Sequence, residues 1–154
     1  YAILSSLADV PINQNLAVTG SVDQSGRVQA IGGVNQKIEG FYAVCKARGL
    51  TDDQGVLIPA ANVRHLMLDD EEIEAVREGR FHNYAVSDVT EGIELLTGMP
   101  AGEPDDEGNY PEGTLFARVQ AKLDTYADRI KAEAPQGGEG PGGANGAGCP
   151  GCRG

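Results

Sequence analysis

The sequence is short of basic residues and of long apolar runs. Its 154 residues include 12 Lys and Arg against 23 Asp and Glu, which gives a formal net charge of −11. This excess of negative charge repels phosphate groups, so we expect neither nucleic-acid binding nor docking on anionic membranes. No apolar run approaches the roughly 18 residues that a membrane-spanning helix needs. Because no basic-then-apolar signal segment opens the sequence either, we expect a cytoplasmic protein.

Cysteine is equally scarce. The three cysteines, Cys45, Cys149 and Cys152, are too few and too unevenly spaced for a disulfide framework. Cys149 and Cys152 could supply half of a tetrahedral zinc site, but neither His65 nor His82 stands at a companion spacing. We therefore expect no metal site and interpret this pair as mobile thiols in a tail.

Common catalytic motifs are missing as well. The glycines at 20 and 26 have the wrong spacing for a phosphate-binding loop, and Arg27 and Val28 follow where Lys and Ser or Thr would be required. We expect no ATP site in this chain. No histidine belongs to a local Ser-His-Asp pattern, so a histidine-based triad has no support.

Composition divides the chain into four parts. Residues 1–99 carry the periodic apolar patterns of a folded body. Residues 100–113 are acidic and proline-rich, which is typical of a solvated linker. Residues 114–134 have a helical apolar stripe, and we expect a helix that docks on the body or stands apart. Residues 135–154 are glycine-rich, with no aliphatic side chain larger than Ala, and we expect a disordered tail.

Within the body, the apolar periodicity alternates between helix and strand. We expect helices at 3–8, 34–47, 71–78 and 89–97, a hairpin of strands at 16–22 and 27–31, and single strands at 56–58 and 84–86. This order predicts an α/β fold with α+β layers. Because Tyr1 stands where Met would begin a complete chain, and the first helix shows only its later part, we expect the sequence to be the C-terminal part of a longer domain.

The clearest predicted helix spans residues 34–47. Its predicted buried face consists of Val34, Ile38, Phe41, Val44 and Cys45. Gly49 suits the position that ends this helix, and Asp88 is a candidate N-terminal cap for the helix at 89–97.

Lys37 lies in the first turn of this helix, directly after Gly32 and Gly33. The helix dipole disfavours a cation at that end, and partial burial would also favour the neutral amine. A neutral lysine can act as a general base at neutral pH. Spacing alone fits an ordinary exposed lysine better.

Five ordered segments resemble the proteolytic domain of Lon proteases, most closely its Lon-related branch. They are AVTGSV (17–22), GRVQAIGGVNQKIEGF (26–41), VCKARGL (44–50), GVLIPAAN (55–62) and EGIELLTG (91–98). The resemblance implies a compact α/β domain that hydrolyses peptide bonds with a serine–lysine dyad. It also implies that an ATPase module upstream of Tyr1 uses ATP and Mg to feed unfolded or damaged proteins into a ring, usually a hexamer.

The resemblance assigns the catalytic lysine of the family to Lys37 and the threonine that orients it to Thr19. Without the resemblance, Thr19 would be an ordinary strand residue. Four apolar side chains would form a wall that keeps the amine neutral: Val18, Ile31, Val34 and Ile38.

The nucleophilic serine of the family has no counterpart here. It lies at the start of the first helix, so we expect it less than about two helical turns before Tyr1. Ser5 and Ser6 lie too deep in that helix to match. We therefore expect the 154 residues alone to be inactive. Two alternatives remain: a non-catalytic ring or scaffold module that keeps Lys37 and Thr19 as relics, and an unrelated acidic binding domain.

Overall fold

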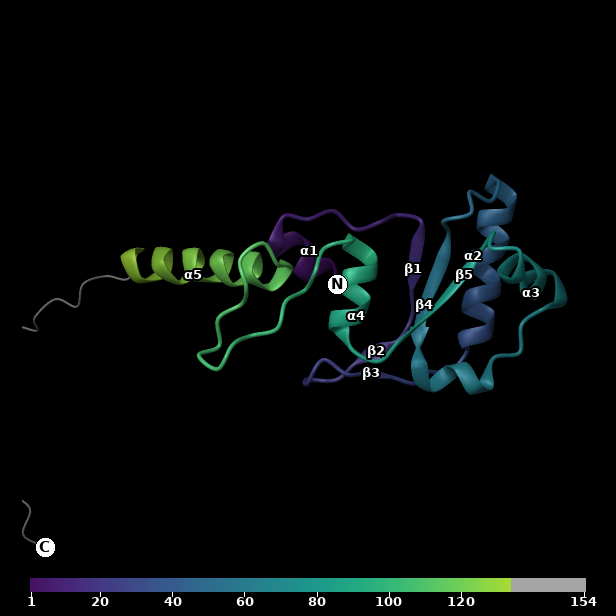
Figure 1. Cartoon of the computed structure of the whole chain (residues 1–154), viewed down its shortest axis with the longest axis horizontal. Coiled ribbons are helices and arrows are strands. Elements are labelled where there is room, and N and C mark those ends of the chain that lie inside the picture. The colour runs from purple at the N-terminus through teal and green to yellow at the C-terminus, as the bar shows by residue number, and fades with distance from the viewer. Residues whose placement is uncertain (134–154) are drawn as a thin grey trace, which may run out of the picture.

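A three-stranded parallel sheet lies at the centre of residues 1–133, the part of the chain that the computed structural model describes. Its strands are β1 (Leu16–Val18), β4 (Gly55–Pro59) and β5 (His82–Val86), in the order β1-β4-β5. Because all three strands run in one direction, their carboxyl ends meet at a single edge, at the bottom of Figure 1. The predicted α/β fold is confirmed.

Helices cover both faces of this sheet. They are α1 (Ala2–Ala8), α2 (Val34–Arg48), α3 (Asp70–Arg77), α4 (Val89–Thr97) and α5 (Leu115–Glu133), and a short 3-10 helix, η1 (Ala60–His65), follows β4. Figure 1 shows α2 and α3 on one face of the sheet and α1 and α4 on the other. The fold is therefore layered, with the sheet between two layers of helices.

Strand β4 is buried at every position because both of its faces are covered. Val56 and Ile58 belong to the core under α2 and α3, whereas Leu57 packs with Val86 and Leu96 on the opposite side. Successive side chains of a strand point to opposite faces, so one short apolar run supplies both cores. Burial of each aliphatic side chain contributes about 1.5–3 kcal/mol.

Helix α2 presents a slightly different face from the predicted one. Val34, Ile38, Tyr42 and Cys45 are buried, whereas Val44 is 52% exposed. The prediction for Val44 was wrong. Neighbouring residues of a helix point about 100° apart, so the side chain of Val44 points away from the buried face that holds Cys45. Tyr42 takes the place in the core and meets the Phe81 ring edge-on, with the ring centroids 5.2 Å apart.

The single strand predicted over 16–22 is two strands. β1 ends at Val18 and pairs with β4, whereas β2 (Ser21–Val22) pairs antiparallel with β3 (Val28–Gln29). The chain changes direction at Gly20, where φ is 152° and an added Cβ would come within 3.4 Å of Pro59 and Val28. The prediction failed here because a continuous β-branched run does not reveal a change of pairing partner.

The remaining predicted elements of the body are confirmed, with shifts of at most two residues at their ends. Helix α4 has the predicted bounds, and the Oδ1 atom of Asp88 accepts the backbone N–H groups of Thr90 and Glu91 at 2.8 and 3.1 Å. Gly98, at φ 67°, ends this helix.

Helix α5 docks by its first turns and then extends away from the sheet (Figure 1). Leu115 and Val119 are buried with Ala8 of α1, and the N–H of Leu115 donates to the carbonyl of Pro100 at 2.9 Å. The segment predicted as a solvated linker thus starts with docked residues, and Ala101 is fully buried. The tail predicted at 135–154, with Cys149 and Cys152, lies outside the described residues.

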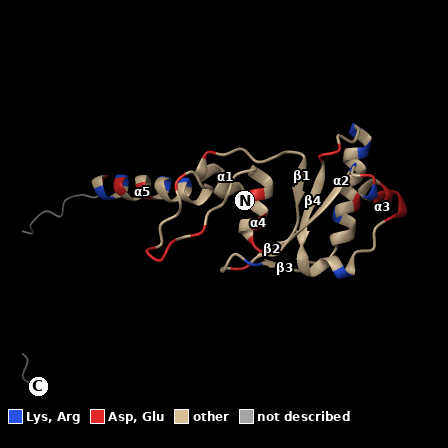
Figure 2. Cartoon of the chain, viewed as in Figure 1, with Lys and Arg blue, Asp and Glu red and all other residues tan. Residues whose placement is uncertain are grey.

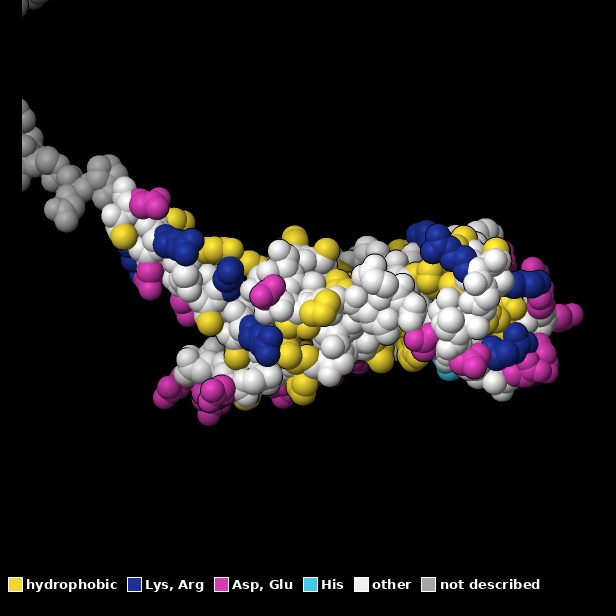
Figure 3. Space-filling view, turned by 90° about the horizontal axis from the view of Figure 1, so that it is seen from above, with side chains coloured by type: hydrophobic (Ala, Val, Ile, Leu, Met, Phe, Trp, Pro, Cys, Tyr) yellow, Lys and Arg dark blue, Asp and Glu magenta, His cyan; other side chains and the backbone are white. Residues whose placement is uncertain are grey.

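Charge and apolar surface are distributed unevenly over this fold. Acidic side chains gather on α3 and in the loop before α5 (Figure 2). The space-filling view shows charges of both signs at the end formed by α2 and α3, and hydrophobic side chains along α5 (Figure 3). Within residues 1–133, no helix combines the length and the apolar character needed to cross a membrane.

Candidate active site at the carboxyl edge of the sheet

The start of α2 is fixed at the carboxyl edge of the sheet by one side chain. Asn62 lies in η1, directly after β4, and is 6% exposed. Its Oδ1 atom accepts the N–H of Ile31 at 3.0 Å, and its Nδ2 atom donates to the carbonyl of Ile31, also at 3.0 Å. This double contact ties the segment that leads into α2 to the end of β4.

Gly33 then turns the chain into the helix. It stands at the N-terminal cap with φ 68° and ψ 27°, a left-handed conformation that glycine adopts without strain. The N–H of Lys37 donates to the carbonyl of Gly33 at 3.3 Å, so Lys37 lies in the first turn, as predicted. The backbone of Lys37 is therefore held near the carboxyl ends of β1 and β4, where α/β proteins commonly bind ligands.

Thr19 lies at the same edge because it follows the last residue of β1. Its N–H donates to the carbonyl of Leu57 at 3.0 Å, which extends the pairing of β1 with β4 by one residue. The side chain is half-buried. It lines a cavity of about 150 Å³ together with Tyr1, Val18, Gly20, Val22, Val28 and Val86. Most of that lining is apolar.

The two predicted site residues share this edge but do not contact each other by a hydrogen bond within the described residues. Lys37 is exposed, so residues 1–133 do not supply the burial that would favour its neutral amine. Val34 and Ile38 of the predicted wall belong to the core beneath α2, and Val18 is 42% exposed. The functional roles of Lys37 and Thr19 stay predictions.

Ser5 and Ser6 lie inside α1, before the left-handed turn at Asp9 that ends the helix. The hydroxyl of Ser5 donates to the carbonyl of Val10 at 2.6 Å and thereby helps to end the helix. Ser6 is exposed. Neither side chain is held as an activated nucleophile.

The contacts of His65, His82 and Cys45 are those of ordinary structural residues. His65 is exposed at the end of η1, and the Nε2 atom of His82 lies 2.8 Å from the carbonyl oxygen of Asp52. Cys45 is a free thiol in the core, where burial raises its pKa. Residues 1–133 contain no group of three His, Cys, Asp or Glu arranged to hold a metal ion.

Sequence reasoning missed two features of this region. The contact of Asn62 with Ile31 joins positions 31 residues apart, and no local pattern predicts it. Tyr1 is the other, because its hydroxyl is buried, packs against Gly92 and has no hydrogen-bond partner among residues 1–133. Burial, followed by the charges of Asp88 and Glu91, raises the pKa of this phenol.

The structure is thus a layered α/β domain with a lysine at the carboxyl edge of its parallel sheet. Known proteins have related sequences. The family model of the Lon protease (S16) C-terminal proteolytic domain matches residues 1–96. The chain belongs to the Lon protease family. The resemblance of the five sequence segments is thereby confirmed.

Individual relatives agree with this assignment. The chain is 52% identical over 122 residues to a Lon protease homolog of Escherichia coli, covering 79% of this chain and 20% of that protein. It is 43% identical over 128 residues to a Lon protease homolog of Haemophilus influenzae, covering 82% and 21%. An archaeal Lon protease of Methanocaldococcus jannaschii is 47% identical over 75 residues, covering 49% and 10%. The chain spans about a fifth of the length of the first two relatives.

Proposed function

We propose that this chain supplies the lysine half of a serine–lysine dyad that hydrolyses peptide bonds. The observation that carries the proposal is the fixed start of α2 at the carboxyl edge. The Asn62 side chain holds Ile31 there by two hydrogen bonds, six residues before Lys37 and close to the end of the strand that leads into Thr19. A general base must be held in one place, and this anchoring fixes the backbone from which Lys37 projects.

In the proposed reaction, the Lys37 amine accepts the hydroxyl proton of a serine while the serine oxygen attacks the peptide carbonyl carbon. Backbone N–H groups stabilise the resulting oxyanion. The tetrahedral intermediate then expels the amine of the departing fragment, which takes the proton from the Lys37 ammonium. Water, deprotonated by the same amine, hydrolyses the acyl-serine ester and regenerates both side chains. The Thr19 hydroxyl accepts a hydrogen bond from the Lys37 amine and holds it in one rotamer.

In this proposal, the nucleophilic serine and the ATPase module lie outside these 154 residues. The serine precedes Tyr1 in the whole protein, and the 154 residues alone do not hydrolyse peptides. An upstream ATPase module uses ATP and Mg to deliver unfolded or damaged proteins to a cytoplasmic homo-oligomeric ring. We expect this ring to be a hexamer, which a mass measurement of the whole protein tests. The apolar residues around Lys37 that desolvate its amine come from the same missing segments or from a neighbouring subunit.

One observation favours the alternative, a non-catalytic ring or scaffold module. Lys37 is exposed within the described residues and makes no ion pair there. An exposed lysine lacks the desolvation by which proteins turn a lysine into a general base. In a scaffold module, the contacts of Asn62 and Gly33 would serve only the fold, and substitution of Lys37 would leave every activity of the whole protein unchanged.

The two proposals separate in a cleavage assay on the whole protein. Lys37→Ala should lower the rate of casein cleavage at least about 100-fold, the scale of a lost general base. Arg48→Ala is the matched control, because Arg48 is an exposed cation at the opposite end of the same helix. It should leave cleavage unchanged. Undiminished cleavage by a folded Lys37→Ala variant would favour the scaffold.

A further inference from the structure

Strand β5 is an outer strand of the sheet, and β4 pairs with only one side of it. The N–H of His82 donates to the carbonyl of Gln54 at 3.0 Å, so the backbone of His82 faces β4. Because the backbone groups of successive strand residues point to opposite sides, those of Asn83 and Ala85 point away from β4. Within residues 1–133, no backbone group pairs with them there. The N–H and carbonyl groups of Asn83 and Ala85 form the open edge of β5.

The protein itself adds a strand at the next position of this side. The N–H of Val28 in β3 donates to the carbonyl of Ser87 at 2.8 Å, and Arg27 forms an antiparallel bridge with Asp88. Ser87 follows β5 in the same alternation, so its backbone faces the same side as the open edge. Strand β3 ends at Gln29 and does not extend along the open edge. The open edge is therefore positioned to accept a further extended segment.

A groove lies beside the open edge on the side of α4. Its volume is about 550 Å³, and its lining includes Ala85 of β5, Glu91, Glu94 and Leu95 of α4, and Met99. Leu95 is 39% exposed, so an apolar surface is available there. Ala85 belongs both to the open edge and to the groove. A strand that pairs with β5 would therefore place alternate side chains in this groove.

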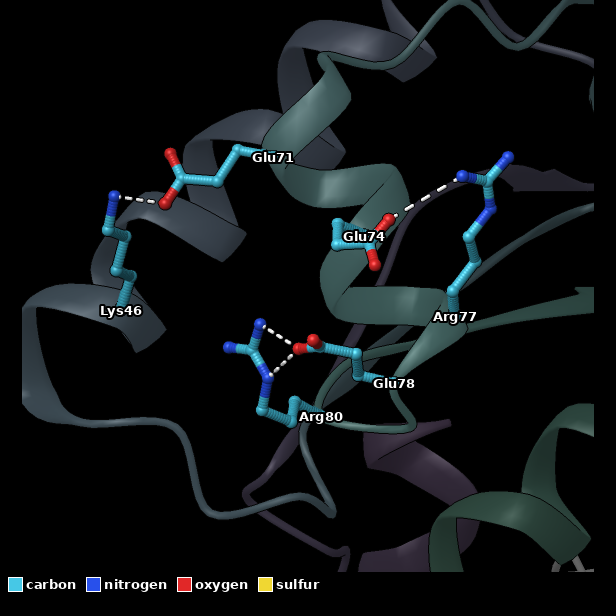
Figure 4. Close-up of polar contacts among 6 residues, drawn as sticks. All are labelled: Lys46, Glu71, Glu74, Arg77, Glu78 and Arg80. Carbon is cyan, nitrogen blue, oxygen red and sulfur yellow. Dashed lines mark hydrogen bonds and ion pairs between the residues drawn. The ribbon is translucent and has the colours of Figure 1, made fainter.

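The groove is acidic, and its carboxylates have no cation. One oxygen of Glu91 and one of Glu94 accept backbone N–H groups, and neither side chain forms an ion pair within the described residues. Figure 4 shows the contrast around α3, where each of three carboxylates has a cationic partner: Glu71 with Lys46, Glu74 with Arg77, and Glu78 with Arg80. The groove therefore complements a basic side chain, whose stem can lie along Leu95.

The same charges disfavour a second copy of this chain at the open edge. Pairing of β5 with β5 of another copy would place two acidic grooves side by side. Glu91 and Glu94 of both copies would then lie near one another without an intervening cation, and such contact between like charges is costly. The open edge thus favours an extended segment that carries positive charge.

We propose that the open edge of β5 binds an unfolded polypeptide as an added strand, with a basic side chain of that strand in the groove beside α4. The N–H groups of Asn83 and Ala85 donate to carbonyls of the added strand, and their carbonyls accept its N–H groups. Backbone pairing of this kind does not depend on the guest's sequence. The choice of an unfolded polypeptide as the occupant rests on the proposed function.

The test is an NMR titration of the ¹⁵N-labelled 154-residue chain with the peptide acetyl-Thr-Val-Thr-Lys-Thr-Val-Thr-amide. At saturation, the peptide should slow hydrogen exchange of the Asn83 and Ala85 amides about ten-fold, because each gains a hydrogen bond. The Tyr84 amide, which faces β4, should change much less. Methylation of one alternate set of backbone nitrogens in the peptide should abolish binding, and methylation of the other set should leave it unchanged.

Three variants make the test specific. Ala85→Pro removes an N–H that points away from β4, so the sheet should stay intact while peptide binding weakens about ten-fold. Glu94→Gln keeps the oxygen that accepts a backbone N–H but removes the charge, and it should weaken binding about three-fold. Glu74→Gln is the control, because Glu74 is paired with Arg77 on α3, outside the groove (Figure 4). Its binding should match that of the unsubstituted chain.

Three results would overturn the proposal. The first is equal exchange of the Asn83 and Ala85 amides with and without the peptide. The second is slow exchange of these amides in the peptide-free chain that is lost on dilution, which would show that a second copy occupies the edge. The third is binding of a fluorescent form of the peptide by the 154-residue chain but not by the whole protein, which would show that another part of the protein covers the edge. Binding requires no catalysis, so failure of peptide cleavage would contradict the proposed function alone.

Discussion

The side-chain amide of Asn62 holds the backbone of Ile31 from both sides. Oδ1 accepts the N–H and Nδ2 donates to the carbonyl, both at 3.0 Å. In this way one side chain of η1 replaces the two hydrogen bonds that a neighbouring strand would otherwise give to Ile31. The contact sets where α2 begins and therefore where Lys37 stands.

Replacing Asn62 should loosen the start of α2. Asn62→Leu removes both hydrogen bonds and leaves two backbone groups of Ile31 unpaired, so we expect the free energy of unfolding to fall by about 2 kcal/mol. Urea unfolding measures this loss, and hydrogen exchange at Ile31 should become faster. Asn35→Ala is the control, because Asn35 makes a single exposed contact, to the N–H of Met67 at 3.2 Å. An equal loss in both variants would contradict the account.

The pH dependence of stability should show the raised pKa of the Glu72 carboxyl group. Its pKa rises from a usual value of 4.5 to about 7 in the folded chain. Between these values, the unfolded chain releases the proton first, so the folded state loses stability as pH rises through this window. Glu72→Gln removes this loss. We expect the variant to be more stable than the unsubstituted chain by about 2 kcal/mol at pH 8, and by little at pH 4.

Thermal or urea unfolding at the two pH values measures this difference. Glu74→Gln changes an exposed carboxylate of the same helix and should give no pH-dependent difference. The groups that titrate elsewhere in the chain cancel, because each comparison is made at one pH. A Glu72→Gln effect that is equal at pH 4 and pH 8 would show that Glu72 ionises normally.

Gly92 should not tolerate a side chain. A Cβ at this position of α4 would overlap the hydroxyl and ring of Tyr1. Overpacking should outweigh the gain in helix propensity, so we expect Gly92→Ala to destabilise the chain by about 1–2 kcal/mol. Gly40→Ala in α2 is the matched control, because a Cβ there meets nothing within 4 Å. It should stabilise the chain by about 0.5–1 kcal/mol. Effects of equal sign would contradict the packing of Tyr1.

Thr19 should act as a positioning residue in the whole protein. Thr19→Val keeps the shape of the side chain but removes the hydroxyl, and we expect kcat for peptide cleavage to fall about 10–100-fold with little change in KM. Thr19→Ser keeps the hydroxyl and should retain most of the activity. Equal activities of the valine and serine variants would show that the hydroxyl has no part in catalysis.

Local patterns predicted the elements that depend on nearby residues. The bounds of α4 follow from the Asp88 cap and from Gly98 at its end, which are both features of the immediate sequence. The apolar run of β4 likewise predicts a strand that is buried on both faces. The five sequence segments identified the family and, through it, the two candidate site residues at one edge of the sheet.

Contacts between distant residues were beyond local patterns. The Asn62–Ile31 pair joins η1 to the segment before α2, and Glu72 belongs to an acidic stretch whose composition predicts a small acidic helix. Its burial depends on how α3 packs on α2, which the spacing of charges does not encode. The switch of pairing at Gly20 has the same origin, because β1 pairs with β4, which lies far along the chain, whereas β2 pairs with the nearby β3.

The central claim, that Lys37 is the general base of a peptidase, is tested most directly by chemical rescue. In the whole protein, Lys37→Ala should be inactive toward a fluorogenic peptide, and added methylamine should restore cleavage in proportion to the concentration of neutral amine. Arg48→Ala should be active without methylamine and should not respond to it. Activity of Lys37→Ala equal to that of the unsubstituted protein, with no response to methylamine, would contradict the claim.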